Sequence, residues 1–288
     1  MRFGCKVYKL ALDGGMTCPN RDGTLDTRGC IFCSGGSGEF AARGTSVNEQ
    51  IERAKPLVAG KIKNGKYIAY FQSYTNTYAD TNYLEKIFTQ AIDRPDIAAL
   101  SVATRPDCLE NDKIALLKSL SEKKPVTVEL GLQTIHEKTA RYIRRGYPLS
   151  VFDDAVSRLH AAGIETVAHV ILFLPGETEQ MMLDTVRHVG RLEVGGIKLQ
   201  LLHVMRDTDL AADYACGKFG LPSMEEYIKT LEKCVRALPR DVIIHRLTGD
   251  GAKRGLIAPM WSADKKRVLN AVNSAFERDN VIQGSDFK

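Results

Sequence analysis

Residues 97–132 read IAALSVATRPDCLENDKIALLKSLSEKKPVTVELGL, and the order of patterns in this stretch decides the fold. The segments at 97–104 and 126–132 are short apolar runs, which are typical of buried strands. Between them, residues 110–120 have the pattern of a helix. A strand, a helix and a second strand of these lengths form a βαβ unit, so the two strands are expected to be parallel.

The same alternation continues on both sides of this unit. Strands are expected at 7–12, 67–72, 97–104, 126–132, 164–174 and 196–202, with a further extended segment at 242–247. Helices are expected from Ser46 onward and at 84–91, 110–120, 136–145, 151–162, 177–192, 224–238 and 262–278. Six strands alternating with helices predict an α/β fold, either a doubly wound sheet or an incomplete barrel. In both, the active site lies at the carboxyl ends of the strands. We expect both faces of each strand to be apolar and covered.

The composition indicates a globular protein. The chain has 288 residues, of which 44% are hydrophobic and 26% charged, so disorder and fibrous repeats are excluded. No apolar run approaches the ~18 residues that span a membrane, and the first thirty residues hold no secretory signal. We therefore expect a cytoplasmic protein without a membrane partner. A net charge of +5 is only mildly basic and does not by itself indicate a nucleic-acid partner.

Three of the seven cysteines are grouped: Cys18 is followed after eleven residues by the C-x-x-C pair Cys30 and Cys33. In a reducing compartment such a group indicates metal or redox chemistry. Three thiolates are one short of a closed zinc site, whereas on a four-iron cluster they leave one iron open. A zinc knuckle and three ordinary loop cysteines remain as alternatives. The nearest downstream histidine is His136, so the missing fourth zinc ligand favours iron–sulfur.

Two segments, CPNRDGT at 18–24 and GCIFC at 29–33, resemble the radical SAM superfamily. Its usual signature is C-x3-C-x-φ-C with an aromatic residue at φ, and Phe32 occupies that position. The eleven-residue spacing resembles the YhcC/YtqA-type subfamily, whose domain is grouped with those of MiaB, NifB and the elongator catalytic subunit. The resemblance implies a partial (β/α)6 barrel at residues 1–210 and a C-terminal extension packed on it at 211–288.

The resemblance also implies two cofactors. A [4Fe-4S] cluster would be held by Cys18, Cys30 and Cys33, and S-adenosylmethionine (SAM) would chelate the open iron. The reduced cluster would cleave SAM to methionine and a 5′-deoxyadenosyl radical that abstracts a substrate hydrogen. The residues implied as SAM contacts are Phe32, Gln72, Ser73, Thr104, Gln133, Arg145, His169, Leu174 and Gly176.

Several of these residues carry specific implied roles. Gln72 or Ser73 would receive the methionine amine, because the family's Gly-Gly-Glu turn is absent after the second strand. Gln133, in a segment similar to the family's G-x-Q-S/T, would bind the nucleoside. A guanidinium fork fits a carboxylate, so Arg145 is assigned to the SAM carboxylate, with Arg144 as the alternative.

The fifth strand and two isolated cysteines complete the implied site. His169 aligns with a position that often carries a ribose-binding acid, and the backbone of 174–176 would meet the adenine. Cys108 and Cys216 are candidates for hydrogen-donating catalytic residues, although buried single thiols are commonly structural.

The substrate is the least determined part. RNA-modifying relatives imply tRNA, specifically the side chain of a wobble uridine, with a cytosolic electron donor as a second partner. Trp261 is available to stack on a base. A small-molecule or peptide substrate is the alternative, as is a non-catalytic iron–sulfur protein for redox sensing or electron transfer. Basic residues that could form an RNA-binding surface are Lys61, Lys63, Lys66, Lys253, Arg254, Lys265, Lys266 and Arg267.

Overall fold

The computed structural model describes residues 3–34, 41, 44, 46–62, 65–249 and 253–287, without the side chain of Lys253. Its main sheet has seven strands in the order β1-β2-β3-β4-β5-β6-β8. Two short strands, β7 (Val204–Met205) and β9 (Leu256–Ala258), pair antiparallel in a second sheet. The strands of the main sheet are β1 (Val7–Leu12), β2 (Lys66–Phe71), β3 (Ile97–Thr104), β4 (Val126–Gln133), β5 (Glu165–Leu172), β6 (Gly196–Leu201) and β8 (Ile243–Arg246).

Helices alternate with these strands, which confirms the α/β class. Among the described residues, the α-helices are α1 (Val47–Val58), α2 (Thr81–Ile92), α3 (Asn111–Lys123), α4 (Glu137–Tyr142), α5 (Leu149–Ala161), α6 (Glu179–Arg191), α7 (Asp209–Ala215), α8 (Met224–Arg236) and α9 (Lys265–Arg278). Short 3-10 turns occupy Pro106–Cys108, Lys253–Gly255 and Met260–Ala263. No helix in the described part of the chain has the length and apolar character that crossing a membrane requires.

The chain forms two compact units. The first holds residues 1–27, 35–131 and 154–166, and the second holds 28–34, 132–153 and 167–288. The boundary after residue 210 that the family resemblance implies therefore stays a prediction.

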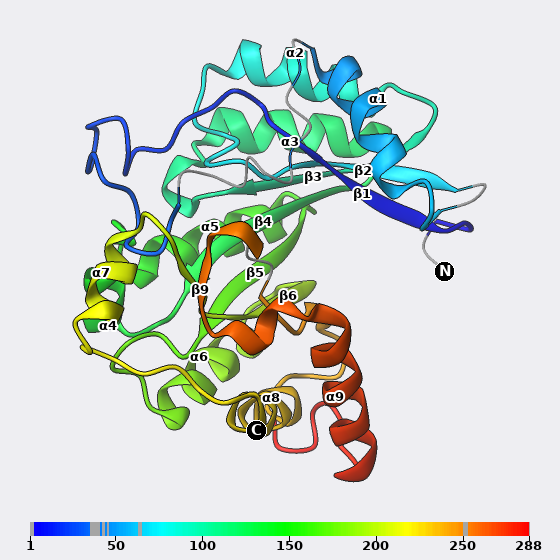
Figure 1. The fold of residues 1–288 in the computed structure, drawn as a ribbon. Helices are drawn as coiled ribbons and strands as arrows, with labels where there is room; N and C mark the ends of the chain where they lie inside the picture. The colour runs from blue at the N-terminus through cyan, green and yellow to red at the C-terminus, as the bar shows by residue number, and fades with distance from the viewer. Residues whose placement is uncertain are drawn as a thin grey trace. The chain divides into compact units, whose positions relative to one another are not determined.

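In the first unit, one face of the sheet is apolar and covered by helices. Strands β1 to β4 pair in parallel, and Leu10, Phe71 and Val102 lie on this face with almost no exposure. Figure 1 shows α1, α2 and α3 on one side of β1 to β3. Phe71 contacts Phe88 of α2 edge-on, with 5.0 Å between ring centroids. Burial of these side chains stabilises the unit from this side.

The opposite face of the same strands is polar, and here the expectation of two apolar faces is wrong. By ladder register, Tyr70 of β2 lies beside Ser101 of β3, and Glu129 of β4 lies on the same face. Lys9 of β1 joins them through hydrogen bonds described below. The apolar run at 126–132 hides this face because its polar positions are only every second residue.

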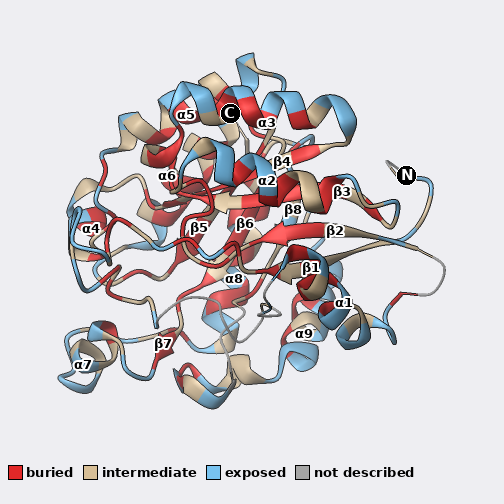
Figure 2. Cartoon of the chain, turned by 90° about the horizontal axis from the view of Figure 1, so that it is seen from above, coloured by how far each residue is buried: buried red, intermediate tan, exposed pale blue. Residues whose placement is uncertain are grey.

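The second unit repeats this two-faced arrangement. Strands β5, β6 and β8 are parallel, and Val170 and Leu199 lie opposite one another on the buried apolar face. On the other face, His169, Lys198 and Arg246 form one row across the three strands. Figure 2 shows β5 and β6 largely in the colour of buried residues, whereas β8 is half-buried to exposed and the outward faces of the helices are exposed.

Candidate functional site

The C-x-x-C pair lies in a tight turn that apolar packing fixes in place. The amide of Cys33 donates to the carbonyl oxygen of Cys30 at 2.9 Å. Ile31, between the two cysteines, donates to Ile143 O at 3.2 Å and accepts from Leu210 N at 3.0 Å. Ile31 also packs into an apolar cluster with Phe32 at its edge, while both thiols stay half-exposed. The cluster consists of Ile31, Ile143, Ile171, Leu174, Leu202, Val204, Leu210 and Ala258.

Arg144 lies beside this turn. Its carbonyl oxygen is 3.6 Å from Cys30 Sγ, and its guanidinium donates to Gly29 O at 3.2 Å. The same guanidinium forms an ion pair with Asp209 at the start of α7. Arg144 has a φ of 56°, in the left-handed region, and this explains why the helix expected at 136–145 ends at Tyr142.

Arg145, the residue to which the resemblance assigns the SAM carboxylate, is instead bound within the fold. Its guanidinium donates to Tyr147 O at 2.9 Å, to Leu132 O at 3.3 Å and to Thr134 O. It also pairs with Glu137 at 2.9 Å, and its side chain is 2% exposed. This guanidinium fork is committed to backbone carbonyls and one carboxylate. The structure therefore does not support Arg145 as a carboxylate ligand, and Arg144 is the arginine beside the cysteine turn.

Gln133 ends β4 in a strained backbone conformation. Its φ is 66°, and its Oε1 atom is buried without a hydrogen-bond partner among the described residues. Non-glycine residues in the left-handed region cost roughly 1–3 kcal/mol and cluster at functional sites. A buried acceptor without a partner carries a further cost, which a ligand donor would remove. Both observations point to a ligand at Gln133.

The turns that follow β4 and β5 are joined by a buried hydrogen bond. The Thr134 hydroxyl donates to Glu177 Oε1, and Glu177 N donates to Leu174 O at 3.0 Å. Burial raises the pKa of the Glu177 carboxyl, while the Thr134 hydrogen bond opposes that rise. This contact holds the 173–177 turn against the residue that follows Gln133.

The three implied SAM contacts in β5 and the turn after it differ in which group is available to a ligand. His169 is half-buried on the polar face, in register with Lys198. The Leu174 side chain is buried in the apolar cluster, so that only its backbone is available to a ligand. Gly176 has a φ of 83° and open space around its Cα, as a turn that approaches a ligand requires.

In the first unit, the Cys18 loop and the loop after β2 meet at the carboxyl ends of β1 and β2. The carbonyl oxygen of Cys18 accepts from Arg21 N at 2.7 Å, which forms a turn. The adjacent Thr17 accepts from Thr75 N at 3.3 Å, and Leu12 O accepts from Gln72 N at 3.3 Å. Gln72 and Cys18 thus lie at the end of the strands where an α/β site is expected.

The loop after β2 contains a residue that the sequence reasoning missed. Asn76 is fully buried, and its Nδ2 donates to Ala103 O at 2.8 Å, but its Oδ1 is buried without a partner in the described residues. Ser73, one of the implied amine ligands, is 1% exposed in the same loop. The sequence signal for Asn76 is the polar run at 72–77, directly after a buried strand. Polar residues at such a place commonly bind ligands or form turns.

Thr104, another implied SAM contact, faces the helices. It pairs with Leu130 on the helix-covered face of the sheet, and its hydroxyl is 2.6 Å from that of Thr77. Its side chain packs under the loop instead of sharing the face of Gln72, so the structure does not support it as a SAM ligand.

The two candidate hydrogen donors differ in environment. Cys108 is buried, and burial raises the pKa of its thiol to about 12, so that it keeps its proton at neutral pH. Cys216 is exposed at the C-cap of α7.

The basic residues are divided between the two units. Lys61 and Lys66 lie at the amino ends of the strands, opposite the Cys18 end of the first unit; Lys66 begins β2, and Lys61 contacts Tyr8 of β1. Arg254 and the stretch 265–267 are exposed in the second unit. Lys63 and the side chain of Lys253 lie outside the described residues.

The three cysteines of the motif are divided between the units: Cys18 belongs to the first, and Cys30 and Cys33 belong to the second. Within the described residues, no three His, Cys, Asp or Glu side chains are gathered as a metal site. The ligand set therefore rests on the motif and on the family.

Comparison with known proteins gives consistent matches along the chain. Residues 27–189 match the family model described as the radical SAM superfamily, and 194–278 match the radical SAM C-terminal domain. YtqA of Bacillus subtilis is 42% identical over 288 residues, which cover 99% of this chain and 89% of that protein. The tRNA uridine(34) acetyltransferase of Methanocaldococcus jannaschii is 25% identical over 53% of this chain and 28% of its own length. The solved structure of archaeal Methanocaldococcus infernus Elp3, with residues 1–46 deleted, has a TM-score of 0.73 and 17% identity over 96% of this chain and 64% of that one. This likeness shows the same α/β partial-barrel fold.

Proposed function

The chain belongs to the radical SAM superfamily, and from this premise we propose that it modifies the side chain of a wobble uridine in tRNA. Membership makes it an enzyme whose cofactors are a [4Fe-4S] cluster and SAM. When bound, these cofactors supply the one-electron cleavage of SAM that gives a carbon radical able to abstract hydrogen.

The residues present fit these cofactors. SAM carries an ammonium group and ribose hydroxyls, which are hydrogen-bond donors, and the structure holds two buried acceptors without described partners, Gln133 Oε1 and Asn76 Oδ1. We assign the nucleoside to Gln133 and the amine to the loop that contains Gln72, Ser73 and Asn76. The carboxylate is assigned to Arg144, which lies beside Cys30.

Other residues of the site would hold the cluster, shield it or supply a hydrogen atom. Cys18, Cys30 and Cys33 would hold the cluster, and their half-exposed thiols are open to a ligand. Phe32 and the apolar cluster cover one side of the cysteine turn and keep water from that side. The protonated Cys108 thiol is our candidate for returning a hydrogen atom.

The observation that carries the tRNA proposal is the shared region with the tRNA uridine(34) acetyltransferase, a protein whose name states its substrate. The charge at the start of α9 supports it. Lys265, Lys266 and Arg267 are exposed in the first turn, which contains no acidic residue. Cations oppose the helix dipole there, so these charges do not serve the helix and suit an anionic partner such as RNA phosphate.

The test compares nucleosides from bulk tRNA of cells with and without the gene by mass spectrometry. We expect a precursor wobble uridine to accumulate in the deletion strain and to disappear when the wild-type gene is returned. Return of the gene encoding Cys33→Ala should leave the precursor in place, because the cluster is lost. An unchanged profile in the deletion strain, under conditions of expression, would move the proposal to a small-molecule or peptide substrate.

A further inference from the structure

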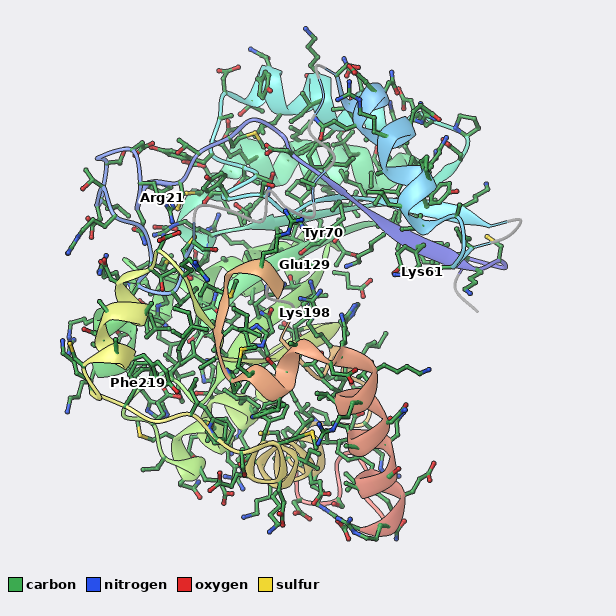
Figure 3. All side chains as sticks on the ribbon, viewed as in Figure 1. Arg21, Lys61, Tyr70, Glu129, Lys198 and Phe219 are labelled. Carbon is green, nitrogen blue, oxygen red and sulfur yellow. The ribbon has the colours of Figure 1, made fainter. Side chains whose placement is uncertain are left out.

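Four polar side chains on the polar face of the first unit form one hydrogen-bonded group. Glu129 Oε2 accepts from the Tyr70 hydroxyl at 2.8 Å, and its Oε1 accepts from Ser101 at 3.0 Å. Lys9 pairs with the same Oε1, lies 3.5 Å from Ser101 Oγ, and has its ammonium 4.6 Å from the Tyr70 ring centroid. Figure 3 shows Tyr70 and Glu129 side by side.

Along the strand direction, Glu129 of this group lies at the same height as Gln72, one of the implied SAM contacts. Glu129 pairs with Ala103, and Phe71 pairs with Val102, so Gln72 lies one residue further along β2, next to Ala103. Gln72 follows Tyr70 by two residues and therefore shares its face. The backbones of Lys9 and Tyr70 lie nearer the amino ends of the strands than Glu129 does, and their long side chains extend toward its carboxylate.

Stability alone does not explain why this group is polar. A buried ion pair is often no more stable than packed apolar residues of similar volume, which the other face of the same strands already carries. The exposure is also uneven, because the Glu129 side chain is 0% exposed and that of Lys9 is 32% exposed. Only the lysine opens to a ligand.

Lys9 has a hydrogen-bond donor left over. Its ammonium carries three hydrogens, and within the described residues it meets two oxygens, those of Glu129 and Ser101. The carboxylate, the hydroxyl and the aromatic face of Tyr70 hold the ammonium in one position.

We propose that Lys9 is a substrate-binding residue that donates a hydrogen bond to an oxygen acceptor of the substrate nucleotide, either a base carbonyl or an anionic oxygen. Glu129, Tyr70 and Ser101 are positioning residues that aim its ammonium. This proposal rests on the proposed function, since it names a contact made by the tRNA substrate.

The experiment uses cofactor-loaded enzyme and tRNA purified from the gene-deletion strain. Lys9→Met keeps the length of the side chain and removes its donor and charge. We expect KM for this tRNA to rise about ten- to a hundredfold, as the loss of a hydrogen bond from a charged group predicts. SAM cleavage without tRNA should stay at the wild-type rate, because Lys9 contacts no cofactor in this proposal.

Two further variants distinguish the kinds of oxygen. Lys9→Arg keeps the charge, and Lys9→Gln keeps a neutral donor. Recovery by both indicates a base carbonyl, whereas recovery by Lys9→Arg alone indicates an anionic oxygen. Recovery by neither, when Lys9→Met is impaired, still supports a contact that requires the ammonium itself.

Lys61→Met is the matched control. Lys61 also donates to a tyrosine hydroxyl, Tyr8 at 3.0 Å, and lies over that ring at 5.3 Å. It lies at the amino end of the sheet, away from Tyr70 and Glu129, as Figure 3 shows. We expect its KM to match the wild type.

A double variant separates binding from folding. Lys9→Met alone leaves the Glu129 carboxylate buried without its cation, which can destabilise the protein. Lys9→Met with Glu129→Gln removes that charge and keeps an acceptor for Tyr70. If Lys9 only neutralised Glu129, the double variant would recover activity; the proposal predicts that its melting temperature recovers while KM stays high.

The two proposals fail in different ways. Wild-type turnover of the tRNA with an unchanged KM for Lys9→Met overturns the role of Lys9 alone. Absence of wild-type turnover overturns the proposed function, and the assignment of Lys9 to a nucleotide falls with it.

Discussion

Left-handed backbone at non-glycine residues marks the carboxyl ends of three strands. Tyr74 follows β2 with a φ of 59°, Gln133 ends β4 with 66°, and Phe173 follows β5 with 65°. Each costs free energy that a glycine would not. Backbone strain of this kind clusters at functional sites, and Gln133 also has a buried acceptor without a partner among the described residues.

Replacement of Gln133 by alanine should weaken SAM binding about tenfold, because one hydrogen bond of ordinary strength is lost. Iron content should stay at the wild-type level, since no cluster ligand changes. Equilibrium dialysis with labelled SAM and iron analysis measure the two quantities. Gln180→Ala, on the exposed side of α6, is the control. Unchanged SAM affinity in Gln133→Ala would remove this residue from the site.

Replacement by alanine should affect stability at Arg145 and SAM binding at Arg144. Arg145→Ala removes four hydrogen bonds from a buried guanidinium and should lower the free energy of unfolding in urea by about 3 kcal/mol. Arg144→Ala should instead weaken SAM binding about tenfold or more with a smaller loss of stability. A larger SAM effect in Arg145→Ala than in Arg144→Ala would restore the assignment that the family resemblance implies.

At the scale of elements, apolar periodicity predicted the main sheet well. Each of the six expected strands is present with ends that shift by at most two residues, and the segment at 242–247 is β8. The pattern failed where elements are short. The seven residues of α7 and the two of β7 are too few for a period to be recognised.

Site residues could be proposed from the sequence only where a motif names them. The C-x-x-C pair and the residues after β4 and β5 share the second unit, where Cys30 Sγ contacts Arg144 O and the Thr134 hydroxyl donates to Glu177. The side chain of Thr104 could not be placed, because the face of a strand end depends on register, which single-sequence patterns do not give. Asn76 carries no motif, and its buried oxygen is visible only in three dimensions.

Helix α8 provides a pH prediction. Cys234 is fully buried on its inner face, and burial raises the pKa of this thiol from 9.0 to about 12. The folded state therefore keeps the proton while the unfolded thiol ionises above pH 9, so stability is complete below pH 9 and falls as pH rises toward 12. Between pH 9 and 10.5, Cys234→Ala should reduce the slope of unfolding free energy against pH by roughly 1 kcal/mol per pH unit.

The exposed Cys216 is the control for this measurement, because the folded state does not bury its side chain. Cys216→Ala should leave the slope unchanged. An equal slope in wild type and Cys234→Ala would contradict the burial effect.

At the scale of the whole molecule, the net charge is only +5, but three basic residues are grouped in the first turn of α9. If tRNA binds there, affinity should fall with salt, since each neutralised phosphate releases counterions. Replacement of Lys265, Lys266 and Arg267 by alanine should reduce the slope of log affinity against log salt by about two. Filter binding between 50 and 200 mM salt, roughly the range over which this effect is large, measures it.

Lys61→Ala with Lys66→Ala is the control, because both lysines lie at the amino ends of the strands in the first unit. The same decrease in slope in both variants would indicate a diffuse charge effect instead of a binding surface on α9.

The pairing of Lys9 with Glu129 has a consequence for how the protein is made. The two residues are 120 positions apart, and synthesis at roughly 5–20 residues per second places several seconds between them. Until β4 leaves the ribosome, the first strand carries a lysine without its carboxylate, although its apolar face can already pack against α1. The nascent chain must therefore wait for its fourth strand before the polar face is complete, and the substrate contact we propose is among the last features of this unit to form.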